Sequence, residues 1–88
     1  MIRRRVVVHG RVQGVGFRVS VARRAEQRRL AGWVQNRPDG DVEAVFEGEP
    51  EAVESLVRFC RDGPRGASVE QVEVTDEEPE GLSWFDVR

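Results

Sequence analysis

Two stretches of the chain have helical periodicity, and each is apolar along one stripe only. The stripes consist of Phe17, Val21, Ala22 and Ala25 in the first stretch, and Val53, Leu56, Val57 and Cys60 in the second. We expect the first helix to end near Leu30, before Gly32, and the second to run from Pro50 to the Gly63-Pro64 stop. A helix with one apolar stripe must bury it, so both helices are expected on one face of a sheet.

Segments with alternating or β-branched residues surround these helices and predict the strands of that sheet. They are residues 3–8, 33–36, 41–47, 69–75 and 82–87. The resulting order is β-α-β-β-α-β with an additional C-terminal strand, which predicts an α+β, ferredoxin-like split βαβ sandwich with an antiparallel sheet. A chain of 88 residues has room for one hydrophobic core, so we expect a single domain over residues 1–88.

Composition excludes several classes of protein. The apolar runs are too short for a transmembrane helix, and Met1 to Val6 is basic without the apolar region of a signal peptide. Cys60 is the only cysteine and His9 the only histidine, so neither a disulfide nor a histidine–cysteine metal site is expected. We therefore predict a cytoplasmic protein that needs no membrane, metal or other cofactor.

The charges are divided unequally along the chain. Residues 1–37 have ten arginines and one acidic residue, whereas residues 38–88 have four arginines and fifteen acidic residues. One interpretation is ion pairing between two halves that fold together. Another is an anion-binding site in the first half, because arginine binds phosphate and carboxylate with two parallel hydrogen bonds. Arg23, Arg24 and Arg28 share the polar face of the first helix, where a solvated face is the expected role and nucleic-acid contact or substrate steering the alternative.

A glycine-rich segment, Gly10 to Arg18, joins the first strand to the first helix. Free backbone N–H groups and the helix dipole favour an anion at such a place, and Arg18 can add its guanidinium. The alternative is a glycine-rich turn with a solvated arginine. The segment contains no Asp, Glu, Cys or Ser, so it offers neither a nucleophile nor a general acid.

The absence of an acid restricts the chemistry that this segment could perform. A phosphate monoester expels an alkoxide, which normally needs an acid or a metal. An acyl phosphate expels a carboxylate, whose conjugate acid has a pKa of about 4. The simplest compatible reaction is hydrolysis of a carboxylic–phosphoric anhydride by a positioned water molecule.

Two longer motifs add a family resemblance. Val12 to Arg18, followed by Gly32 to Glu43, closely resembles the acylphosphatase family. The resemblance implies a metal-independent, ferredoxin-like enzyme that releases a carboxylate and inorganic phosphate. It further implies that Arg18 binds the phosphoryl oxygens and that Asn36 orients the attacking water. The implied phosphate-binding loop consists of Gln13, Gly14, Val15, Gly16, Phe17 and Arg18.

Two positions depart from the family pattern. Val21 stands where many members have a threonine, and Arg29 stands where a glycine often ends the first helix, so we expect that helix to end differently. His9 lies beside the loop, where a strand-end residue without a catalytic role is expected.

The remaining aromatic residues and the alternative functions complete the predictions. Trp33, Phe46, Trp84 and Phe85 are expected in the core or on the sheet face rather than on a base-stacking platform. Alternatives to the enzyme are a ferredoxin-like RNA-binding module, because residues 14–19 loosely resemble the RNP1 consensus, and an inactive acylphosphatase-like module of a larger assembly. The expected partner is a small-molecule acyl phosphate bound by a monomer, with no nucleic acid.

Overall fold

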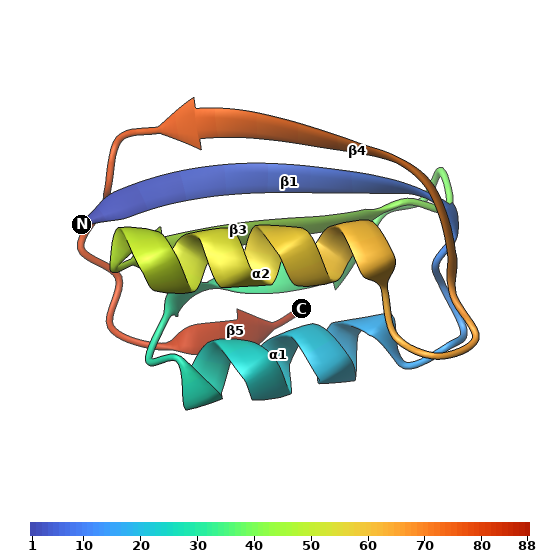
Figure 1. Ribbon diagram of the computed structural model, residues 1–88, viewed down its shortest axis with the longest axis horizontal. Coiled ribbons are helices and arrows are strands. Elements are labelled where there is room, and N and C mark those ends of the chain that lie inside the picture. Colours follow the sequence, from blue (N-terminus) through green and yellow to red (C-terminus); the bar gives the residue numbers. More distant parts are fainter.

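The computed structural model describes all of residues 1–88 and confirms the predicted order of elements. The elements are β1 (Ile2–Arg11), α1 (Phe17–Gln27), β2 (Ala31–Asn36), β3 (Val42–Gly48), α2 (Pro50–Asp62), β4 (Ser68–Glu77) and β5 (Phe85–Val87). One sheet has the order β4-β1-β3-β2-β5, and both helices cover the same face of it (Figure 1). Neither helix has the length and apolar content that crossing a membrane requires.

A single core lies between the helices and the sheet. Both predicted apolar stripes contribute to it, together with alternate residues of the central strands. Its members without solvent exposure include Val6, Val8, Val21, Ala25, Val34, Val42, Ala44, Phe46, Val53 and Cys60. Because one cluster takes side chains from both helices and from β1, β2 and β3, these elements depend on one another for stability.

The arginine run at the start of β1 accounts for the unequal charge distribution. Each of Arg3, Arg4 and Arg5 forms ion pairs with carboxylates from the second half of the chain. The pairs are Arg3 with Glu47, Glu77 and Glu80, Arg4 with Glu54 and Asp76, and Arg5 with Glu43 and Glu77. For these three arginines, the unequal charge distribution is therefore explained by ion pairing between the two halves of the chain.

The last strand differs from the predicted antiparallel arrangement. β5 is confined to Phe85–Val87 and runs parallel to β2, whereas all the other pairs are antiparallel. The connection from Glu77 to Phe85 can extend roughly 28 Å. That length is enough to cross the four strand spacings of about 4.8 Å between β4 and β5. Glu47 holds the middle of the connection at the end of the sheet where β4 stops, so β5 starts at that end and runs parallel to β2.

Glu47 fastens that connection to the sheet. Its carboxylate, only 1% exposed, accepts hydrogen bonds from the backbone N–H groups of Glu80 (2.7 Å), Gly81 (2.8 Å) and Leu82 (2.9 Å). Burial acts to raise the pKa of Glu47, but these donors and the Arg3 guanidinium outweigh it, and the pKa lies below its ordinary value. The negative charge therefore stays in place and orders the crossing segment.

The aromatic residues were placed correctly except for one. Trp33 and Phe46 are buried, and Phe85 stacks on Phe46 with 5.8 Å between ring centroids. Trp84 is 71% exposed, so its assignment to the core or the sheet face is wrong. It lies in the crossing segment before β5, where the chain no longer alternates between two faces.

The end of α1 contradicts the expectation drawn from Arg29. This residue has a φ of 57°, in the left-handed region. Its N–H donates to the carbonyl of Glu26, and the N–H of Leu30 donates to that of Ala25, which are the two bonds of a Schellman motif. The helix thus ends in the geometry that a glycine ordinarily supplies, with an arginine in the strained position.

We predict that Arg29→Gly stabilises the protein. A left-handed conformation costs a non-glycine residue about 1–2 kcal/mol, part of which is offset by the larger unfolded-state entropy of glycine. The expected net gain of about 1 kcal/mol corresponds to a rise in Tm of roughly 4–8 °C for a domain of this size. The matched control is Arg28→Gly, at a φ of −95°, which should lower the Tm. An unchanged or lower Tm for Arg29→Gly would show that the left-handed conformation of Arg29 does not destabilise the folded protein.

Candidate active site

The loop between β1 and α1 is shorter than the predicted glycine-rich segment. β1 continues to Arg11, past an irregularity between His9 and Gly10, so Gly10 belongs to the strand. A Cβ at Gly10 would lie 2.2 Å from the carbonyl oxygen of Ser68, which explains the glycine by the close approach of β4. The loop itself comprises residues 12–16.

Two of its residues have left-handed backbones. Gly14 has a φ of 76° and Gly16, the residue before α1, a φ of 75°. A Cβ at either position would meet nothing within 4 Å, so the backbone conformation and not space requires glycine there. Both glycines lie within three residues of the start of α1, so their left-handed conformations set the direction in which the loop enters the helix.

The backbone N–H groups of residues 13–18 donate to no other group of the chain. The first main-chain bond of α1 runs from the N–H of Ser20 to the carbonyl of Gly16, at 3.0 Å. Unpaired N–H groups at a helix N-terminus carry partial positive charge, and the helix dipole adds to it. This stretch therefore offers donors to an anionic group.

Gln13 holds the loop to the turn between β2 and β3. Its side-chain amide donates to the carbonyl oxygens of Arg37 (2.8 Å) and Asp41 (3.0 Å). The sequence placed Gln13 in the loop, but its anchoring contacts depend on residues more than twenty positions away. They bring the loop beside the end of β2.

Arg18 is oriented by the last strand. Its Nη1 donates to the main-chain oxygen of Arg88 at 2.8 Å, and the N–H of Arg88 donates to the carbonyl of Val34, also at 2.8 Å. Arg18 forms no ion pair, so its remaining N–H groups have no carboxylate partner. The sequence predicted Arg18 but not Arg88, because no local pattern marks a contact across 70 residues.

Asn36 lies on the sheet side of the site. It is the last residue of β2, on the same face as the buried Val34, and its side chain forms no hydrogen bond within the chain. It lines a cleft of about 120 Å³ together with Arg18. The cleft is completed by Val12, Gly14, Gly16, Phe17 and Val19. Gln13 and Val15, the other predicted loop residues, do not line it.

His9 supports the neighbouring turn from outside the cleft. Its Nδ1 lies 2.8 Å from a carboxylate oxygen of Asp41, and its Nε2 contacts Glu73 on β4. The hydrogen bond with Glu73, opposed by burial and reinforced by the charge of Asp41, raises the pKa of His9. Since the carbonyl of Asp41 also accepts from Gln13, His9 and Gln13 hold the same turn.

Three other residues singled out in the sequence, Val21, Arg29 and Cys60, lie away from the cleft. Val21 is fully buried in the core, and Arg29 lies at the opposite end of α1. Cys60 is a buried free thiol whose burial raises its pKa to about 12. Phe17 is only 2% exposed, so the RNP1-like string lacks an aromatic ring available for stacking on a base. No three or more His, Cys, Asp or Glu side chains gather into a metal-binding group.

This ferredoxin-like domain is suited to binding an oxyanion. Free backbone amides, an arginine and an asparagine without a hydrogen-bond partner surround one small cleft. The family model described as acylphosphatase matches residues 4–87. The chain therefore belongs to the acylphosphatase family. This membership confirms the predicted family, the ferredoxin-like fold and an enzyme that hydrolyses acyl phosphates.

Individual relatives agree with this assignment. The chain is 57% identical over 88 residues to an acylphosphatase of Nostoc sp., covering 100% of this chain and 87% of the relative. A crystal structure of acylphosphatase from Bacillus subtilis superposes with a TM-score of 0.96 at 43% identity, covering 100% and 99% of the two chains. Full-length HypF in its phosphate- and nucleotide-bound form matches with a TM-score of 0.91 at 28% identity, covering 99% of this chain but only 12% of HypF.

Proposed function

We propose that residues 13–18 and Asn36 form the active site for acyl phosphate hydrolysis. The observation that supports this most strongly is the run of six unpaired backbone N–H groups beside Arg18 and Asn36. In this assignment the loop amides and the Arg18 guanidinium bind the phosphoryl oxygens, with the guanidinium donating two parallel hydrogen bonds. Gln13, through its side chain, positions the loop.

The reaction follows from these groups. The Asn36 amide holds a water molecule by hydrogen bonds and, being neutral, does not repel the anionic substrate. The water oxygen attacks phosphorus while the bond from phosphorus to the acyl oxygen breaks. The electron pair of that bond leaves with the carboxylate, which needs no protonation because its conjugate acid has a pKa of about 4. A phosphoryl oxygen accepts the proton of the water, so the products are carboxylate and inorganic phosphate.

The experiment that tests this assignment is hydrolysis of benzoyl phosphate with and without a chelator. We expect equal rates in the presence and absence of excess EDTA, because backbone amides and Arg18 neutralise the charge that a metal would otherwise neutralise. Release of benzoate and phosphate in equal amounts checks the stoichiometry. Loss of activity with EDTA and its return on adding a divalent metal would contradict the proposal.

We further infer that the 88 residues act as one domain and as a cytoplasmic monomer without a nucleic-acid partner. The single core supports one domain, and the buried, free Cys60 fits a reducing compartment. Light scattering on the purified chain tests the monomer. Titration with single-stranded RNA at low salt tests the absence of a nucleic-acid partner, where a salt-dependent affinity would contradict it.

A further inference from the structure

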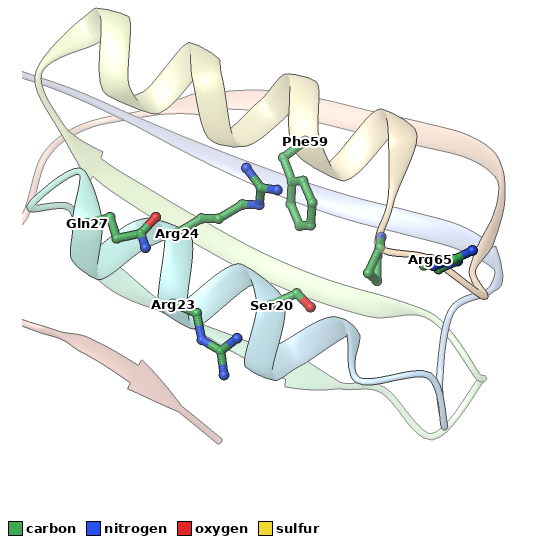
Figure 2. Close-up of a pocket in the computed structure, with 7 residues that line it drawn as sticks. Ser20, Arg23, Arg24, Gln27, Phe59 and Arg65 are labelled. Carbon is green, nitrogen blue, oxygen red and sulfur yellow. The ribbon is translucent and has the colours of Figure 1, made fainter.

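A second cleft lies between α1 and the C-terminal end of α2 (Figure 2). Its volume, about 340 Å³, is larger than that of the cleft at Arg18 and Asn36. The residues that line it include Arg23, Arg24, Arg65, Ser20, Gln27 and Phe59. None of its lining residues is acidic, although the chain as a whole has a net charge of −2.

The three arginines of this second cleft have no carboxylate partner within 4.0 Å, whereas Arg3, Arg4 and Arg5 each have at least two. Cations gathered without counter-charges repel one another and raise the free energy of the folded state. A bound anion would remove that repulsion. Arg28 and Arg58 are unpaired as well, so what distinguishes the second cleft is that three unpaired arginines line one hollow.

One of the three guanidinium groups is held in place by stacking. The guanidinium carbon of Arg24 lies 4.1 Å from the ring centroid of Phe59, and Figure 2 shows the side chain reaching from α1 across to that ring. Phe59 in turn packs against Phe17 with 6.4 Å between ring centroids. Stacking uses the face of the guanidinium and leaves the N–H groups at its edge free to donate.

We propose that this second cleft binds a small phosphate-bearing ligand, separately from the active site. The positive charge of the lining attracts the double negative charge of a phosphate, whose oxygens can accept from the edge of a guanidinium group and from the Ser20 hydroxyl. The volume falls at the small end of the range of about 300–1,000 Å³ found for ligand sites. Because the two clefts share no lining residue, substitutions in one leave the groups of the other in place.

The test is a titration of the protein with inorganic phosphate, followed by the NMR shifts of its backbone amides. In the wild type we expect two groups of shifts, one over residues 12–18 and one over residues 20–27 and 63–66. In the double variant Arg23→Gln, Arg65→Gln the second group should weaken, with its Kd raised about 10-fold or more. The first group and the hydrolysis of benzoyl phosphate should stay unchanged.

A matched control has the same loss of charge outside the second cleft. Arg28→Gln with Arg58→Gln removes two exposed arginines that form no ion pair and do not line it, and should leave both groups of shifts intact. The proposal is overturned if wild-type shifts are confined to residues 12–18, or if both double variants lose the second group equally. Tighter binding of single-stranded RNA than of phosphate at residues 20–27 would also overturn it. Missing shifts at residues 12–18 would instead contradict the active-site assignment.

Discussion

Arg18→Ala should reduce kcat and weaken the binding of inorganic phosphate together, each by about 10²-fold or more. The guanidinium contacts the phosphoryl group both before and during the transfer in the proposed mechanism, so its loss affects binding and rate alike. Steady-state kinetics with benzoyl phosphate give kcat, and competitive inhibition by inorganic phosphate gives its dissociation constant. A circular dichroism spectrum and Tm close to the wild type would show that the fold is retained.

Two further variants make the Arg18 result specific. Arg18→Lys keeps the charge but loses the planar pair of donors, so it should recover only part of the activity. Arg11→Ala removes an exposed arginine at the end of β1, next to the loop but outside the cleft, and should keep nearly full activity. Full activity of Arg18→Ala would place the site elsewhere.

Asn36→Ala should lower kcat by about 10²-fold or more while the affinity for inorganic phosphate stays nearly unchanged. The amide is expected to hold the attacking water and not the phosphoryl group, so its removal affects the chemical step. The same two measurements separate the effects. Equal losses in both quantities would show that Asn36 contacts the phosphate instead.

Asn36→Asp and Gln35→Ala are the matched comparisons for this residue. Asn36→Asp keeps the shape but adds a negative charge next to the substrate, so the affinity for phosphate should fall as well. Gln35 is the preceding residue of β2, on the opposite face of the sheet, where it donates to Glu43 at 3.0 Å. Gln35→Ala should therefore retain the wild-type kcat.

Periodicity was sufficient to predict most of the fold. The one-sided stripes of α1 and α2 and the alternation in β3 depend on local spacing, and the structure confirms all three elements. The direction of β5 and the exposure of Trp84 depend on how a connection crosses the sheet, which no local pattern encodes. The end of α1 at Arg29 was missed because an arginine occupies a position that the rules of helix ends assign to glycine.

The site shows the same division. Gly14, Gly16, Arg18 and Asn36 were predicted from motifs, and the structure brings them together around one cleft. The groups that hold them there, such as Arg88 on Arg18 and the β2–β3 turn on Gln13, act across the fold. The sequence cannot reveal these contacts, because Arg88 and Arg37 accept the hydrogen bonds through main-chain oxygens, which any residue could provide.

The anchor of Arg18 belongs to the least securely paired part of the molecule. β5 is three residues long, lies at the edge of the sheet, and depends on β2 and on the segment that Glu47 fastens. Partial melting of residues 78–88 would release the Arg18 side chain while the four other strands and both helices keep their shared core. We therefore expect activity to be lost at a lower temperature than the one at which the other strands and the helices unfold, although β5 has no residue in the cleft.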